Sequence, residues 1–254
     1  MKRIVLKVGS AVLTQDGAIA VERMQSLVDF LADLRQIYEV ILVSSGAVAG
    51  GYTKLKLNRD ILSNKQALAA IGQPVLMQKY AKKFQKHKVL CAQVLVTAAN
   101  LDKSDDIKRV KNTIDTLLGN GVIPIVNEND ATATDELELG DNDQLSAYIT
   151  KHTSSDMLVI LSDIDAYYDS DPRNNADAKA LKTVDNISDA ELQKEVTPND
   201  AFATGGIVTK LKAASYLMQH NTDMFLASGF KLEDIKNFLL HNKHTGGTLF
   251  KAQR

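Results

Sequence analysis

The 254-residue chain is 44% hydrophobic, which is enough to bury the core of one large domain. Its 30 basic and 31 acidic side chains leave a formal net charge of -1, which argues against a role in binding nucleic acid or an anionic membrane. No apolar stretch approaches the roughly 18 uncharged residues that span a bilayer. The start Met1-Lys2-Arg3 leads into a predicted strand rather than a signal-peptide core, so we expect a cytoplasmic protein.

Short β-branched runs alternate with amphipathic stretches along the chain, a pattern typical of βαβ units and a mainly parallel sheet. The apolar runs predict strands at 4–8, 40–43, 89–96, 122–126, 157–161 and 224–227. Apolar residues at helical spacing predict helices at 24–34, 63–71, 105–118, 143–151, 207–219 and 232–240. Because the strand runs are continuously apolar, helices should cover both faces of the sheet. The sequence therefore predicts a layered α/β fold.

Three smaller features complete the predicted organisation. Ser63 to Gln66 and Ser188 to Glu191 both read as capping boxes at helix starts. The polar segment 167–199 has little apolar periodicity and should pass over one edge of the sheet. The single cysteine, Cys91, lies in an apolar run and is expected to act as a small buried hydrophobe.

Small residues follow two of the predicted strands, in Lys7-Val8-Gly9-Ser10 and in Ser44-Ser45-Gly46-Ala47. Glycine and serine allow backbone N–H groups to approach an anion closely, and a helix that starts there adds the positive end of its dipole. One such loop is weak support, because glycine at a strand end is usually plain geometry. Two loops that meet a third at one edge of the sheet are stronger support for a site.

The third strand end is a cluster of acids and amides. The apolar run 123–126 stops at Asn127-Glu128-Asn129-Asp130, and Gly140-Asp141-Asn142-Asp143 follows. Carboxylates accept from an ammonium group, while an amide can donate to a carboxylate and accept from an amine, so the cluster suits a small zwitterion. A strand that runs into a solvated turn is the plain alternative.

A fourth element, Thr204-Gly205-Gly206-Ile207-Val208-Thr209-Lys210, opens a predicted helix. Paired glycines at a helix start with a lysine one turn inside suit a polyphosphate, whose oxygens would meet N–H groups and an ammonium group. A simple turn with a surface lysine is the alternative. Neither the Walker pattern nor a protein-kinase catalytic loop occurs, so a nucleotide would be bound by another scaffold.

Charged residues in and directly after the predicted strands limit the kinds of ligand and reaction that the site could support. A lysine inside an apolar run, Lys7, should be buried only with an anionic partner. Asp163 ends another strand after Ser162, where it could orient the lysines or a metal-bound phosphate. None of the five histidines falls in a motif loop. An acceptor that is already ionised at pH 7, such as a carboxylate with a free pKa near 4.3, would need no base.

Taken in order, these motifs resemble the amino acid kinase family over nearly the whole chain. The 127–131 and 140–143 segments, with the paired glycines before Lys210, resemble most the members that phosphorylate the side-chain carboxylate of L-glutamate with ATP, which opens proline biosynthesis. The resemblance implies a three-layer αβα sandwich with a mainly parallel sheet of about eight strands. It implies one domain, 1–254, whose half 1–150 binds the acceptor and whose half 151–254 binds ATP.

The resemblance also implies residue roles. The catalytic residues would be Lys7, Lys210 and Asp163. L-Glutamate would be held by Ser45, Gly46, Asp130, Asp141, Asn142 and Asp143. ATP would be bound by Lys7, Gly9, Ser10, Ser162, Asp163, Thr204, Gly205, Gly206, Ile207, Val208, Thr209 and Lys210. Mg²⁺ would be held by phosphates and water rather than by protein side chains, and Asp163 would position the two lysines.

The resemblance further implies a homo-oligomer, a dimer or a tetramer, without nucleic-acid or membrane partners. Two departures from the family pattern are Ser162, where threonine is frequent, and Ala166, where glycine is frequent. Bacterial relatives often carry an additional PUA domain, and this chain resembles the kinase domain alone. Two alternatives stay open: a member that phosphorylates aspartate or N-acetylglutamate, and a non-catalytic ligand-binding member of the fold.

Overall fold

The structure is a computed structural model that describes residues 1–97, 100–101, 103–132, 142–193 and 206–253. An eight-stranded sheet lies at its centre, in the order β5-β6-β4-β1-β7-β9-β10-β8. The strands are β1 Lys2–Val8, β4 Tyr38–Ser44, β5 Cys91–Val96, β6 Ile123–Glu128, β7 Met157–Ser162, β8 Thr183–Val184, β9 Asp223–Ser228 and β10 Thr248–Phe250. All neighbouring pairs are parallel except β9 and β10. The predicted mainly parallel sheet is confirmed.

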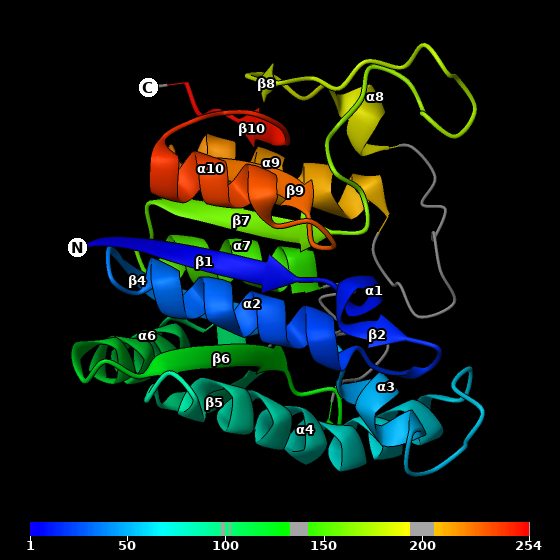
Figure 1. Cartoon of the computed structure of the whole chain (residues 1–254), viewed down its shortest axis with the longest axis vertical. Helices are drawn as coiled ribbons and strands as arrows, with labels where there is room; N and C mark the ends of the chain where they lie inside the picture. The colour runs from blue at the N-terminus through cyan, green and yellow to red at the C-terminus, as the bar shows by residue number, and fades with distance from the viewer. Residues whose placement is uncertain (98–99, 102, 133–141, 194–205, 254) are drawn as a thin grey trace.

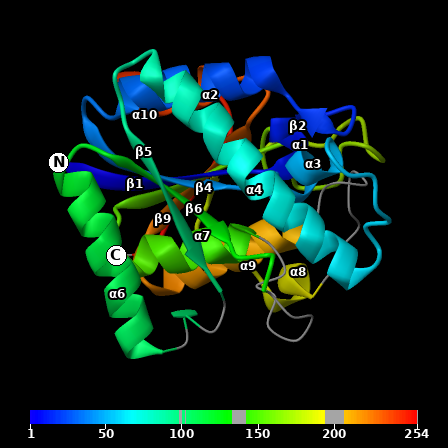
Figure 2. The same cartoon turned by 90° about the horizontal axis from the view of Figure 1, so that it is seen from below.

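Helices cover both faces of this sheet (Figure 1). They are α1 Ser10–Leu13, α2 Val21–Leu34, α3 Ala47–Tyr52, α4 Leu62–Gln85, α6 Ser104–Gly119, α7 Asn142–His152, α8 Asp189–Leu192, α9 Ile207–Gln219 and α10 Glu233–His241. Figure 2 shows α2, α4 and α10 on one side of the sheet and α6, α7 and α9 on the other. A short hairpin, β2 Thr14–Gln15 with β3 Ala18–Ile19, follows α1. The three-layer αβα sandwich is therefore present.

Alternate residues of the central strands fill two separate cores. In β1, Ile4 and Leu6 pack with α2, α4 and α10, whereas Val5 packs with α6, α7 and α9. Successive side chains of a strand point to opposite faces, so a strand covered on both sides is apolar at nearly every position. Lys7 shares the face of Val5, and its side chain is thereby directed toward α7 and α9.

The sequence prediction matches the six long strands, whereas several details were wrong. The edge strand β5 is only partly covered, with Leu95 36% exposed, so helices do not cover both faces there. The predicted helix 63–71 instead runs to Gln85 through Pro74, because the apolar stripe continues to Tyr80 and Phe84 and its burial outweighs the loss of one hydrogen bond. Its N-cap is Ile61, without a side-chain cap from Ser63.

Other predicted details are confirmed fully or in part. The capping box from Ser188 to Glu191 is present at the start of α8. Cys91 is partly buried and packs against the core that contains α2 and α4. The described part of 167–199 passes the sheet edge, but it also adds the edge strand β8, which at two residues is too short for periodicity to predict.

Glycines bring α3 and α4 into close contact near the carboxyl ends of the strands. A Cβ built on Gly72 would lie 1.7 Å from the carbonyl oxygen of Ala47, and one built on Gly51 would lie 1.9 Å from that of Leu68. No side chain fits in either place. Gly46 caps α3 with a φ of 104°, a left-handed conformation that favours glycine. The backbone that follows β4 is therefore held close to α4.

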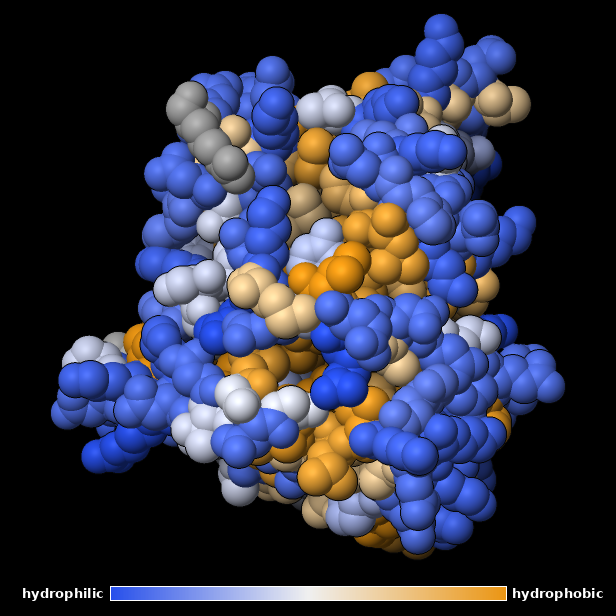
Figure 3. Space-filling view, turned by 60° about the vertical axis from the view of Figure 1, so that its left-hand side comes forward, coloured by the Kyte–Doolittle hydropathy of each residue, from blue (hydrophilic) through white to orange (hydrophobic). Residues whose placement is uncertain are grey.

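The molecular surface is mostly hydrophilic on the face seen in Figure 3, with apolar side chains reaching it in patches. Near the open edge of the sheet, Leu90 is 72% exposed. No described helix is long and apolar enough to cross a membrane.

Candidate active site

The carboxyl ends of the central strands lie side by side, as the sequence predicts. Val8 pairs with Ser44 of β4 and with Leu161 of β7, and Val43 of β4 pairs with Val126 of β6. The loops that follow these strands consequently meet at one edge of the sheet, the edge at which ligands bind in open α/β sheets.

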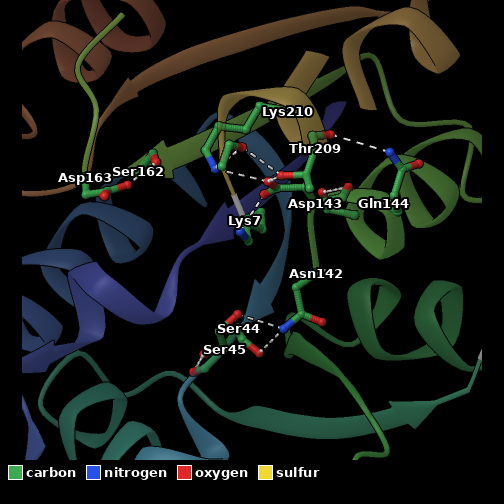
Figure 4. A network of polar contacts seen from close by, with 12 residues as sticks. Lys7, Ser44, Ser45, Asn142, Asp143, Gln144, Ser162, Asp163, Thr209 and Lys210 are labelled. Carbon is green, nitrogen blue, oxygen red and sulfur yellow. Dashed lines mark hydrogen bonds and ion pairs between the residues drawn. The ribbon is translucent and has the colours of Figure 1, made fainter. Parts of the chain in front are cut away.

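A buried ionic cluster occupies the centre of this edge. The Nζ atom of Lys7 lies 2.5 Å from Oδ1 of Asp143, and the Nζ atom of Lys210 lies 3.2 Å from Oδ2. Both lysines are 3% exposed and Asp143 is fully buried. Figure 4 shows the three side chains converging from β1, α7 and α9. Two ammonium groups share one carboxylate, so these three groups sum to one positive charge in a buried setting, which favours an anionic ligand.

Hydrogen bonds hold this cluster in place. Thr209 donates through Oγ1 to Oδ2 of Asp143 at 2.9 Å, and Lys210 donates to the carbonyl oxygen of Gly206 at 3.4 Å. Helix α9 begins at Ile207 after its N-cap Gly206, so its first turn faces the same cluster. The positive end of a helix dipole therefore adds to the attraction for an anion.

Asp143 lies between the two lysines that Asp163 is predicted to position. The resemblance predicts that Asp143 contacts L-glutamate and that Asp163 positions the two lysines. In the structure Asp143 contacts both lysines, while Asp163 accepts a hydrogen bond from Ser162 at 2.8 Å. The catalytic role of Asp163 remains a prediction.

Gly9 leaves space beside the ammonium group of Lys7. Its φ of -74° and ψ of 156° suit any residue, so backbone strain does not require a glycine there. A Cβ built on Gly9 would lie 3.9 Å from Nζ of Lys7, and a longer side chain would extend into that space. Ser10 then begins α1 directly after this position. The arrangement suits the close approach of phosphate oxygens.

Asn142 lies next to the ionic cluster but faces the loop that follows β4. Its Nδ2 donates to Oγ of Ser45 at 2.8 Å and to the carbonyl oxygen of Ser44 at 3.2 Å. Ser44 also shares a hydrogen bond of 2.9 Å with the hydroxyl of Tyr80, and burial raises the pKa of that phenol well above its usual value. The Ser45–Gly46 loop and the start of α7 therefore form one wall of the site.

Asp130 lines a neighbouring pocket of about 170 Å³. Gln73, Gln93 and Glu128 also line it, from α4, β5 and β6. The pocket is lined by amide and carboxylate groups, all from the half of the domain, 1–150, that the sequence predicts to bind the phosphoryl acceptor. It places Asp130 at the same sheet edge as Asn142.

Of the remaining predicted site residues, some lie outside the described part of the chain and others lie at the start of α9. Asp141, Thr204 and Gly205 lie outside the described residues. Val208 is only 2% exposed and belongs to the buried side of α9, so a contact with ATP would have to use its backbone. Ile207 is half-buried at the first position of that helix.

Gln73 was not predicted from the sequence as a residue of this site. This residue lies in the apolar stripe of α4, where it is 8% exposed between buried Ala69 and Leu76. A polar side chain in such a stripe is the signal that could have identified it, since a buried amide needs hydrogen-bond partners.

The described part of the chain contains no group of three or more acids, histidines or cysteines placed to hold a metal ion.

Known proteins match the chain over almost its full length. Residues 2–228 match the profile of the amino acid kinase family. The chain is 51% identical to the glutamate 5-kinase of Leishmania donovani over 253 residues, 100% of this chain and 96% of that protein. It is also 51% identical to the glutamate 5-kinase of Wolinella succinogenes over 255 residues, 98% of each chain.

A solved structure shares the fold at low sequence identity. The isopentenyl phosphate kinase of T. acidophilum aligns with a TM-score of 0.68 and 19% identity, over 98% of this chain and 100% of that one. This likeness extends to the arrangement of strands and helices. By its sequence and its fold, the chain belongs to the amino acid kinase family.

Proposed function

We propose that the protein transfers the γ-phosphoryl group of ATP to the side-chain carboxylate of L-glutamate, which produces γ-glutamyl phosphate and ADP and opens proline biosynthesis. The full-length relatives named glutamate 5-kinase support this substrate pair. One contact supports the chemistry most, the meeting of Lys7 and Lys210 at Asp143. It provides two cations where two anionic reactants must approach each other.

The transfer needs no general base. A carboxylate oxygen of glutamate forms a bond to the γ-phosphorus while the bond from that phosphorus to the β,γ-bridging oxygen breaks, so ADP leaves with the electron pair. The acceptor is already ionised at neutral pH. Lys7 and Lys210 stabilise the negative charge that spreads over the transferring group, and preorganised donors of this kind supply much of the rate acceleration in phosphoryl transfer.

The other predicted residues divide between the two reactants. Gly9, Ser10, Ser162, Asp163 and the segment 204–210 bind ATP, while Ser45, Gly46, Asp130, Asp141 and Asn142 bind L-glutamate. Asp143 bridges the two halves of the domain, 1–150 for the acceptor and 151–254 for ATP. Its contacts with Lys7 of β1 and Lys210 of α9 support this division.

Mg²⁺ would accompany ATP. This ion binds through phosphates and retained waters rather than through a full set of protein ligands. Asp163, held by Ser162, is the described carboxylate at the end of β7 that would orient a metal-bound phosphate. When bound, the ion would neutralise part of the phosphate charge.

We further propose a cytoplasmic homo-oligomer. Both substrates are cytoplasmic metabolites. The exposed side chains of Leu90 and Leu95 at the open edge of the sheet support association between copies. Measurement of the molar mass in solution tests whether the protein is a homo-oligomer.

The activity test measures ADP release and acyl phosphate formation with separate acceptors. L-Glutamate should give ADP together with a product that hydroxylamine traps as a hydroxamate, while L-aspartate and N-acetyl-L-glutamate should give far less. A preference for either of those two acids would overturn the acceptor assignment. Absence of ADP with every acceptor would indicate a non-catalytic member of the fold.

A further inference from the structure

A row of four side-chain amides connects the start of α7 with the edge of the sheet. Asn142 donates through Nδ2 to Oδ1 of Asn127 at 3.0 Å. Asn127 donates through Nδ2 to Oε1 of Gln73 at 2.9 Å, and Gln73 donates through Nε2 to Oε1 of Gln93 at 2.9 Å. We call these four residues the amide row. They come from α7, β6, α4 and β5, so the row crosses from the candidate active site to the surface-exposed Gln93.

Two backbone groups determine the direction of the row. The backbone N–H of Glu128 donates to Oδ1 of Asn127 at 3.0 Å, and because an N–H can only donate, the acceptor must be the amide oxygen. The carbonyl oxygen of Ser44 can only accept, so the atom of Asn142 that lies 3.2 Å from it must be the amide nitrogen. Neither amide can be turned over without placing two donors or two acceptors against each other.

The direction of the row decides what Asn142 presents to a ligand. The two hydrogens of its Nδ2 are shared among three acceptors, in Ser44, Ser45 and Asn127. Its Oδ1 is buried and has no hydrogen-bond partner among the residues that the structure describes. Figure 4 shows the amide nitrogen turned toward Ser44 and Ser45, with the oxygen on the other side. A buried acceptor that lacks a donor is unfavourable, so this oxygen suits a ligand that brings a donor.

L-Glutamate brings one kind of donor. At neutral pH both of its carboxylates are ionised and only accept hydrogen bonds, whereas its ammonium group only donates. The ammonium group is therefore the part of this substrate that Oδ1 of Asn142 can bind. An Asn142 side chain turned over would present its NH₂ group instead and would repel the ammonium group.

We propose that Gln73 is a positioning residue for L-glutamate, acting through Asn127 to keep Oδ1 of Asn142 available to the substrate ammonium group. The inference rests on the function proposed above. Gln73 and Asn127 are 8% and 1% exposed, so Nδ2 of Asn127 finds no ready replacement from bulk water if Gln73 loses its oxygen. Nδ2 of Asn127 would then lack its acceptor, and a shift of this side chain toward a new partner would weaken the bond that Oδ1 of Asn127 accepts from Asn142.

The first experiment compares Gln73→Met with Gln73→Glu. Methionine keeps the length of the side chain but removes the acceptor, and the KM for L-glutamate should rise about tenfold, with kcat and the KM for ATP changing less than about twofold. In Gln73→Glu the new carboxylate side chain retains an oxygen for Nδ2 of Asn127, and the exposed Gln93 can turn its amide to donate. This variant should therefore recover most of the affinity for the substrate L-glutamate. A KM for L-glutamate unchanged in Gln73→Met would overturn the proposal.

Phe84→Leu is the matched control, because Phe84 is fully buried on the same helix and lies outside the amide row. It should lower the melting temperature without raising the KM for L-glutamate. An equal rise in that KM in Phe84→Leu would mean that any weakening of α4 has this effect, which would also overturn the proposal.

A double-mutant cycle tests the route through Asn142. In the Asn142→Ala background, Gln73→Met should change kcat/KM for L-glutamate by less than about twofold, because the group on which it acts has been removed. A tenfold loss in both backgrounds would show an independent effect and contradict the positioning role. The acceptor preference of the unmodified protein is measured first. If it prefers another amino acid, the proposed function fails, while the same cycle with that amino acid still tests Gln73.

Discussion

Two adjacent residues at the start of α7 serve parts of the site that depend on different forces. Asp143 is a buried charge held between Lys7 and Lys210, whereas Asn142 is a neutral amide whose partners determine which atom faces a ligand. Successive helix residues are about 100° apart around the axis, so neighbours can face different walls of a site. In the proposed function, phosphate recognition would depend on net charge, and recognition of L-glutamate would depend on hydrogen-bond direction.

The largest expected effect comes from Asp143→Asn. Removing the carboxylate leaves two buried ammonium groups without their shared counter-charge, and loss of one partner in a buried pair costs about 3–5 kcal/mol of the free energy of unfolding. Urea denaturation measures this loss. Addition of ATP should restore part of it, since the phosphates bring negative charge to the lysines. A variant as stable as the unmodified protein would show that Asp143 does not hold this cluster together.

Lys7→Ala and Lys210→Ala should each lower turnover by about a hundred- to a thousandfold, because each removes a preorganised donor to the transferring group. Steady-state ADP release measures the effect, with circular dichroism to check folding. Lys83→Ala is the matched control, since Lys83 is also buried, at 8% exposure, but bonds to Gln25 far from the site. Normal turnover in either active-site variant would remove that lysine from the mechanism.

Asn142→Ala should weaken the binding of L-glutamate without weakening the binding of ATP. Removal of the Asn142 side chain takes away the hydrogen bonds to the Ser45 loop and the bond proposed to the substrate, so the KM for L-glutamate should rise about tenfold while the KM for ATP stays within about twofold. Initial rates at varied concentrations of each substrate separate the two effects. An equal rise in both values would contradict the separation of the two walls.

Asp115→Asn provides the surface counterpart of Asp143→Asn. Asp115 accepts from Arg3 at 2.7 Å and from Lys111 at 2.5 Å, and its side chain is 33% exposed. Partial burial would raise the pKa of Asp115, but the hydrogen bonds from Lys111 and Arg3 outweigh it and hold that pKa below its usual value. Exposed ion pairs contribute less than about 1 kcal/mol, so the variant should be only slightly less stable at pH 7.

The lowered pKa also sets the pH dependence of that difference. A carboxyl with a depressed folded-state pKa stabilises the protein above its unfolded pKa of about 3.9 and loses this contribution as the pH falls through the folded value. The unmodified protein and Asp115→Asn should therefore converge in stability below a pH of about 4. A difference that grows on acidification would contradict this assignment.

Local sequence patterns were sufficient to predict most of the strands and helices. The run 157–161 is apolar at every position, and the run 4–8 is apolar except at Lys7, a pattern that only a strand covered on both faces requires. Helix α9 has the predicted bounds 207–219. The motif loops were also predicted together, because parallel strands place their carboxyl ends at one edge. The course of α4 through Pro74 was not predicted, since tertiary burial rather than local propensity extends that helix.

The sequence by itself determined which groups the site contains: two lysines, a set of acids and amides, and glycines at strand ends. Only the tertiary structure decided which carboxylate lies between the lysines and which amide neighbours Asn142. The motifs pointed to Asp163 for the lysines, whereas Asp143 contacts both of them, and Gln73 lies 54 positions from its partner Asn127. Contacts between distant residues depend on how helices pack across the sheet, which sequence periodicity does not specify.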